Sequence, residues 1–188
     1  DSVTSIDVDA FYFCNNLTNI YYTGDIVAWC KGIIGLDNIM SSNSMLYIKG
    51  NKIMGDLVLP EGITSIPSYA FYNCSGLTSI TIPDSVTSIG DHTFYICTGL
   101  TSINIPDSVT SIGDYAFSGC GGLTSVTIGS GVTSIGDGAF GWCYKLVEVY
   151  NKSSLNIEKG SRWYGSVGYY AENIYKSEYI SKLSTDSD

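Results

Sequence analysis

A 23-residue unit repeats along this chain and constrains its fold more than any other feature of the sequence. Residues 77–99 read LTSITIPDSVTSIGDHTFYICTG, and the next two stretches of equal length, 100–122 and 123–145, follow the same pattern. Partial copies lie at 62–74 and at 1–23, where the chain opens. A fixed period of this length is typical of a solenoid, in which each repeat is one coil and stacked coils share one core.

Apolar residues recur at fixed places in the unit and predict the shape of one coil. The stretch from Leu77 to Ile82 ends in an alternation of apolar and polar residues, which predicts a short strand. Pro83 ends this strand because proline has no N–H group for a ladder. A second short strand, VTSIG, follows, and Gly90 allows a turn. Asp91 then stands at a position suited to an N-cap, and one helical or 3-10 turn is expected to carry the Phe and Cys into the core.

These positions resemble the BspA-like leucine-rich repeat, whose pattern is close to LxxIxIPxxVxxIGxxAFxxCxx. The match covers 54–145 almost position by position, together with 1–23. The resemblance implies a right-handed solenoid of parallel strands, found on extracellular proteins of bacteria and some protists, many of which act in adhesion. We therefore expect a mostly β, α/β repeat protein that is bacterial and either secreted or on the cell surface.

The chain is expected to form a single solenoid domain over residues 1–188. Because it begins at Asp1 without a signal peptide, we interpret it as a mature or trimmed fragment that lacks its export signal. The domain divides into a first repeat, a divergent coil with a hairpin, regular repeats, a last strand with an aromatic cap over the open apolar end, and a loose tail. These parts are expected at 1–23, 24–53, 54–145, 146–180 and 181–188.

The divergent coil breaks the 23-residue period. Asp25 is placed to cap a turn that runs through Trp29 and Cys30. The stretch LYIKGNKIM predicts a hairpin around Gly50-Asn51, which leads back into the regular repeats. Similar segments accompany BspA-like repeats, so the resemblance implies a variation of the family and not a second domain.

The cysteines follow the repeat. Four of the six recur at the repeat period, and Cys14 ends the first repeat in the same context; the four are Cys74, Cys97, Cys120 and Cys143. Stacked coils place such side chains in a column with neighbours about 4.8 Å apart. Side chains in register point the same way, which leaves their Cβ atoms badly placed for a disulfide. We favour buried free thiols, with bridges as the alternative.

Charge and motifs exclude several classes of function. The formal net charge of −9 argues against nucleic acid or an anionic membrane surface as partner. No apolar run approaches the ~20 residues of a membrane span. No catalytic motif, CxxC pair or dinucleotide fingerprint is present, so we expect no enzyme and no cofactor. The only histidine, His92, has Gly138 as one of its repeat equivalents and is interpreted as solvent-facing filler.

Columns of aspartates are the nearest approach to a metal site. Asp91, Asp114 and Asp137 form one column, and Asp84 and Asp107 form another. Ca²⁺ takes six to eight oxygen ligands, which stacked acids can offer. Each of these acids has a local capping or turn role, however, so no metal site is expected.

Two groups of outward side chains are candidate contact positions. The first follows the outer face of successive strands: Ser79, Thr81, Ser102, Asn104, Ser125, Thr127, Glu148 and Tyr150. The second is Trp142, expected to project from the loop edge near the column of Tyr72 and Tyr95. Aromatic platforms suit sugar or protein contacts. The alternative is that these rings pack over the edges and ends of the stack.

The sequence therefore favours a non-enzymatic binding or adhesion module that contacts a host or matrix protein, or a glycan, through the solenoid face. The alternative is a structural spacer within a larger cell-surface protein. Places that stay constant from unit to unit are accounted for by packing, turns and caps. Specific recognition is most expected outside the unit, in 24–53 and in the aromatic C-terminal cap.

Overall fold

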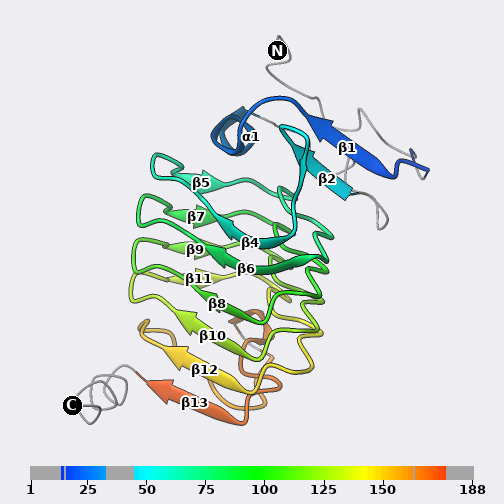
Figure 1. Cartoon of the computed structure of the whole chain (residues 1–188). Helices are drawn as coiled ribbons and strands as arrows, with labels where there is room; N and C mark the ends of the chain where they lie inside the picture. The colour runs from blue at the N-terminus through cyan, green and yellow to red at the C-terminus, as the bar shows by residue number, and fades with distance from the viewer. Residues whose placement is uncertain (1–13, 15, 33–44, 163, 177–188) are drawn as a thin grey trace, which may run out of the picture.

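The computed structural model describes residues 14, 16–32, 45–162 and 164–176, and most of this chain winds as a stack of similar coils (Figure 1). Strands of successive coils pair in parallel and in the register of the repeat, so that Ser65 lies opposite Ser88 and Ser88 opposite Ser111. Helix is nearly absent from the described ranges. The expected leucine-rich-repeat solenoid is confirmed.

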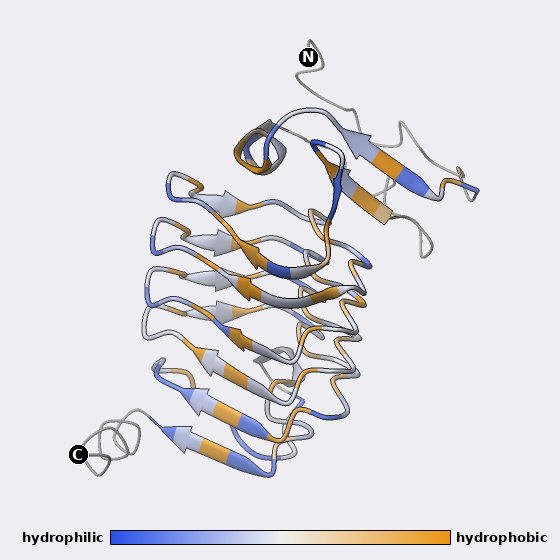
Figure 2. Cartoon of the chain, viewed as in Figure 1, coloured by the Kyte–Doolittle hydropathy of each residue, from blue (hydrophilic) through white to orange (hydrophobic). Residues whose placement is uncertain are grey.

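Two columns of strands form two sides of the stack. The long-strand face consists of β4 (Gly55–Val58), β6 (Leu77–Thr81), β8 (Ser102–Asn104), β10 (Ser125–Ile128), β12 (Glu148–Asn151) and β13 (Asn173–Lys176). The short-strand face consists of β5 (Ser65–Ile66), β7 (Ser88–Ile89), β9 (Ser111–Ile112) and β11 (Ser134–Ile135). Figure 2 shows apolar residues among polar ones along the long strands, as the sequence pattern predicts.

The third side, here called the turn face, is built from the segments 67–74, 90–97, 113–120 and 136–143. A helical or 3-10 turn was the expectation, but consecutive turns with i→i+3 bonds form instead, such as Tyr72 N–H to the Tyr69 carbonyl. Positive φ angles at Tyr69 (62°) and Asn73 (54°) interrupt any helix. The intervening N–H groups donate to the next coil, as Phe71 does to the Thr93 carbonyl at 2.9 Å. All three sides are therefore hydrogen-bonded between coils.

Side chains add a second set of bonds between coils. The Asp91 carboxylate accepts a bond from the Asp114 N–H at 2.8 Å, and Asp114 accepts one from the Asp137 N–H at 2.7 Å. The expectation that these acids cap their own turns is thus wrong, because each acid bonds its equivalent one coil further on. The Thr110 hydroxyl likewise donates to the Thr87 carbonyl at 3.1 Å. Inter-coil bonding explains why these residues recur.

A column of phenylalanine rings forms the centre of the core. The rings of Phe71, Phe94, Phe117 and Phe140 are fully buried and stack, with centroids 5.4, 5.2 and 5.1 Å apart. Beside them the four cysteines that recur at the repeat period are buried and free. The Cys97 thiol donates to the Phe71 carbonyl of the preceding coil at 3.1 Å. The predicted thiol column is present, and no member is bridged.

Cys14 does not join this column. It is exposed, and it precedes β1 (Asn19–Tyr22), which belongs to the divergent N-terminal part and not to the regular stack. β1 pairs in parallel with β2 (Met45–Ile48). The rest of the first repeat, residues 1–13, lies outside the described residues.

The divergent coil contains the elements that its sequence predicts. Asp25 caps α1 (Ile26–Gly32) by accepting a bond from the Ala28 N–H at 2.8 Å. The hairpin joins β2 to β3 (Asn51–Lys52), with its turn one residue earlier than expected, at Lys49-Gly50. Both turn residues have positive φ, as a two-residue hairpin turn of this kind requires. Residues 33–44 lie outside the described ranges.

The C-terminal segment ends the stack by imitating a further coil. The Phe140 N–H donates to the carbonyl of Gly165 at 2.7 Å, as Phe117 donates to that of Ala139. Gly165 lies in η2 (Tyr164–Ser166) with φ 65°, and a Cβ there would approach the Gly136 carbonyl to 2.7 Å. Glycine is therefore required for this close approach. β13 then pairs in parallel with β12.

Phe117→Ala tests the ring column. The ring has no exposed surface and stacks on a ring at each side, so its loss leaves a cavity between three coils. We expect a loss of about 3–5 kcal/mol in the free energy of unfolding by chemical denaturation. Thr81→Ala, at an exposed strand position, serves as control and should change it by less than about 0.5 kcal/mol. A loss below about 1 kcal/mol for Phe117→Ala would contradict this packing.

Thiol labelling tests the cysteine column. Burial raises the pKa of Cys74 and of Cys143 to about 12, and that of Cys97 well above its ordinary value. Because only the thiolate reacts, these groups stay protonated and inert at pH 8. Native protein should therefore react rapidly at one cysteine, the exposed Cys14, and denatured protein at all six. Rapid native labelling of a second cysteine would show that the column is open.

Candidate functional site

The eight predicted strand positions lie together on the long-strand face, in two adjacent rows. In the first row, Ser125 stands in register with Ser102 and Glu148. The second row contains Thr127. Thr127 has Asn104 on one side and Tyr150 on the other. The structure therefore places these residues as one surface, and it places Trp142 elsewhere, on the turn face.

Some of these side chains already bond one another. The Ser79 hydroxyl donates to the Asp56 carboxylate at 2.7 Å, and this bond is the main reason that the pKa of Asp56 is lowered. The Tyr150 hydroxyl donates to Glu148 at 2.8 Å, which raises the pKa of Tyr150. Its ring stacks on Tyr175 with centroids 4.8 Å apart. The remaining predicted side chains are small and polar and form a ladder of similar groups.

The turn face carries a different surface, an aromatic ladder made of Tyr69, Tyr72, His92, Tyr95 and Tyr115. The His92 ring lies 4.7 Å from the ring of Tyr69 and 5.1 Å from that of Tyr115, and Tyr72 stacks on Tyr95 at 5.1 Å. The interpretation of His92 as solvent-facing filler is thus wrong, since its ring is half-buried between two others. Burial lowers the pKa of His92, and the nearby acids oppose this in part.

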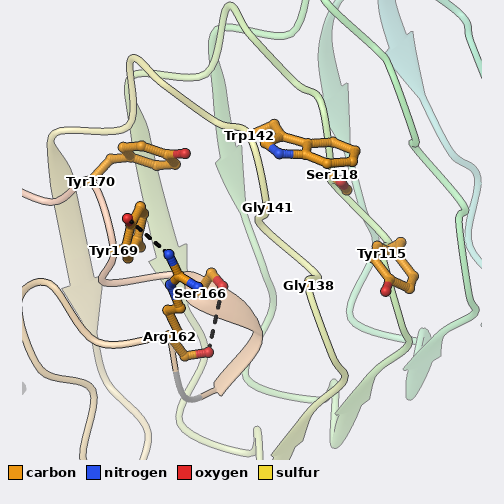
Figure 3. A pocket seen from close by; sticks show the side chains of 9 residues that line it. All are labelled: Tyr115, Ser118, Gly138, Gly141, Trp142, Arg162, Ser166, Tyr169 and Tyr170. Atoms are coloured by element: carbon orange, nitrogen blue, oxygen red, sulfur yellow. Dashed lines mark hydrogen bonds between the residues drawn. The ribbon is translucent and has the colours of Figure 1, made fainter.

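The aromatic ladder ends in a pocket because small residues replace its rings in the next coils. Ser118 stands one coil after Tyr95, and Gly138 stands one coil after Tyr115. Gly141 in turn follows Ser118. The missing rings leave a half-open pocket of about 440 Å³. Figure 3 shows its lining: Tyr115, Ser118, Gly138, Gly141, Trp142, Arg162, Ser166, Tyr169 and Tyr170.

Open aromatic rings form much of the pocket wall. Trp142 is 54% exposed and Tyr115 is 40% exposed, so the prediction that Trp142 projects from the loop edge is confirmed. From the C-terminal cap, Tyr169 meets Tyr170 edge to face with centroids 4.7 Å apart. Two repeats and the cap therefore contribute to one site.

Arg162 supplies the positive charge in the lining. Its guanidinium carbon lies 5.1 Å from the centre of the Tyr169 ring, and Nη2 donates to the Tyr169 hydroxyl at 3.4 Å. This contact raises the pKa of Arg162 further. Among the described residues, no Asp or Glu lines the pocket. Within the described ranges, Arg162 has no acidic partner, so its charge is available to a ligand.

Ser118 is an unusual member of the lining. Its side chain is 1% exposed, and its Oγ has no hydrogen-bond partner among the described residues. A buried hydroxyl without a partner destabilises a fold. Tyr72 and Tyr95 occupy this place in other coils, so the stack does not depend on serine here.

Among the residues of this pocket, the sequence predicted Trp142 as a contact position and favoured the aromatic cap, which contains Tyr169 and Tyr170, as a place for recognition. Tyr115, Ser118 and Arg162 were not predicted as contact positions. A signal was present in the alignment of the repeats, where Ser118 and Gly138 break a column of large rings. Nothing in the sequence places Arg162 beside that break, because the fold of the cap brings it there.

The described residues contain no group of three His, Cys, Asp or Glu side chains that would hold a metal ion. The carboxylates of the aspartate columns accept backbone N–H bonds between coils, as Asp107 does from Ser130 at 2.8 Å. Among the helices of the described part, none has the length and hydropathy needed to cross a membrane.

Solved structures of bacterial repeat proteins resemble this chain. A leucine-rich cell-surface protein from Faecalibacterium prausnitzii A2-165 is 27% identical, with a TM-score of 0.69, over 97% of this chain and 54% of that one. A leucine-rich repeat protein from Bacteroides ovatus is 27% identical, with a TM-score of 0.56, over 94% and 40%. The pneumococcal vaccine antigen PcpA is 25% identical, with a TM-score of 0.54, over 72% and 34%. No curated protein matches.

The chain spans about half or less of the length of these solved proteins. A family model described as the BspA type leucine-rich repeat region, in six copies, matches residues 1–34 and 35–166. The match covers most of the sequence and agrees with the 23-residue register of the strands. The chain therefore belongs to the BspA-type leucine-rich repeat family, which it shares with bacterial cell-surface proteins of the same fold.

Proposed function

We propose that this chain is a non-catalytic binding module of a bacterial surface protein and that it binds through the pocket on the turn face. The observation that carries this proposal is the pocket itself, where open rings meet a cation and a buried hydroxyl that both lack a partner of their own kind among the described residues: an acid for Arg162 and a hydrogen-bond partner for Ser118. Binding sites typically combine aromatic walls with a few placed polar groups. Elsewhere in the stack, recurring polar side chains such as Thr110 and Asp114 bond neighbouring coils.

The pocket suits recognition better than the long-strand face does. Rows of small hydroxyls such as Ser102 and Ser125 look alike from coil to coil, so they offer little chemical discrimination. The pocket instead forms where Trp142 and Tyr115 meet Arg162 from the cap, a combination that the regular coils do not repeat. Trp, Tyr and Arg are the residue types most enriched among binding hot spots. The strand rows remain a proposed secondary surface for weak, multivalent contact.

Trp142→Ala tests this proposal. Binding of the purified chain to arrays of host-matrix proteins and glycans should fall at least tenfold, because the most exposed ring of the pocket is lost. Tyr21→Ala is the matched control, since Tyr21 is 66% exposed but lies on β1, in the divergent N-terminal part. The control should bind within twofold of the unchanged chain. Equal loss in both variants, or arrays that stay blank, would reject the pocket as the binding surface.

A second function, that of a spacer, is favoured by the uniform bonding of the middle coils. The same threonine bond recurs from Thr87 to Thr64, from Thr110 to Thr87 and from Thr133 to Thr110. Such uniformity suits a rod that carries other modules and does not itself bind through its surface. The chain also spans only part of its solved relatives, which leaves room for other modules.

Deletion of residues 100–122 distinguishes the two functions. The deletion removes one complete period, so the remaining strands pair in the same register. It also removes Tyr115 and Ser118 from the pocket. A spacer should then keep the adhesion of the full-length surface protein to host cells, whereas a binding module should lose it. Retained adhesion together with an unaffected Trp142→Ala variant would favour the spacer.

A further inference from the structure

We propose that the pocket binds a carboxylated sugar, such as a hexuronic or sialic acid residue of an acidic glycan. This inference rests on the proposed binding function and adds the chemical class of the ligand. Three features of the lining support it: its aromatic faces, its unpaired guanidinium and its buried hydroxyl. Each matches a different part of such a sugar.

The aromatic faces match the ring of a pyranose. Trp142, Tyr115 and Tyr169 are 54%, 40% and 36% exposed and border the same hollow. The negative face of an aromatic ring attracts the weakly positive C–H groups on one side of a sugar ring. The described part of the lining contains no aliphatic side chain, so it offers little to the apolar anchors of a peptide. Its volume of about 440 Å³ suits a small ligand.

The guanidinium of Arg162 matches the carboxylate. A planar guanidinium binds a carboxylate through two parallel hydrogen bonds. Arg162 rests against Tyr169, which orients it before a ligand arrives, and it has no acidic partner among the described residues. The chain as a whole has a net charge of −9, but the described part of the lining has one arginine and no Asp or Glu. The pocket therefore favours an anionic ligand over a neutral or cationic one.

The hydroxyl of Ser118 matches a sugar hydroxyl. It is buried and unpartnered, and a Cβ on Gly141 would lie 3.5 Å from its Oγ. Figure 3 shows Ser118 and Trp142 among the residues that line the pocket. A hydroxyl both donates and accepts, so a sugar hydroxyl would supply the missing partner once a side chain of the lining shifts and uncovers the Oγ, which is covered in the free protein. The serine then costs stability in the free protein and recovers it on binding.

Calorimetric titration of the full chain with defined sugars tests this inference. The carboxylated probes are trigalacturonate and 3′-sialyllactose, and their neutral counterparts are galactotriose and lactose. We expect the two acids to bind at least tenfold more tightly than their counterparts. Arg162→Gln should remove this preference, whereas Lys52→Gln, which makes the same change of charge at an exposed position on β3, should keep it.

Ser118→Ala provides a readout that a structural role would not give. Binding of the preferred acid should weaken at least fivefold, while the midpoint of chemical denaturation stays unchanged or rises, because an unpaired buried hydroxyl is removed. A lower midpoint would show that Ser118 serves the fold, and it would overturn its assignment to the ligand.

The outcomes separate this inference from the proposed function. Equal binding of acidic and neutral sugars, weakened by Trp142→Ala, would overturn the carboxylate preference and leave the binding function intact. Binding of an acidic peptide (poly-Glu) but of no sugar, again weakened by Trp142→Ala, would overturn the sugar class alone. If no probe binds, the inference is overturned, and the protein and glycan arrays decide the proposed function independently.

Discussion

Hydrogen bonding between coils, in a pattern that recurs with every repeat, is the constraint on which this structure depends. Backbone bonds link neighbouring coils along the two strand columns and the turn face, and side chains such as Thr110 and Asp114 bond the equivalent residue of a neighbouring coil. A parallel stack satisfies its buried backbone only if each coil presents donors where its neighbour presents acceptors. Residues in this network are therefore required by the fold, and only side chains outside the network are free to contact a ligand.

The pocket forms where small residues replace large side chains that the bonding network does not need. The aromatic ladder continues from coil to coil until Ser118 and Gly138 take the places of rings, and the backbone bonds around them stay unchanged. The Phe117 N–H still bonds the next coil at 2.7 Å, as the Phe94 N–H does one coil earlier. A solenoid thus opens a concave site without altering its frame, since the ladder side chains project from the stack.

The sequence predicted the coil, its strands, the thiol column, the Asp25 cap and the hairpin, because each depends on local pattern or on the period. It misassigned Asp91 and Asp114, whose carboxylates reach the next coil, and His92, whose ring stacks between two neighbours. These errors share a cause: a repeat read alone does not show which side chains meet across coils. Arg162 was missed because the irregular cap positions it.

The way in which the cap completes the stack also ties the pocket to one end of the described coils. Gly165 bonds Phe140 as a further coil would, and the same segment brings Arg162 and Tyr169 to the pocket. Inserting or losing 23-residue units elsewhere lengthens or shortens the rod without duplicating the cap. The pocket therefore stays tied to the cap while the length of the stack varies, and a gain or loss of near-identical repeats changes that length without changing the pocket.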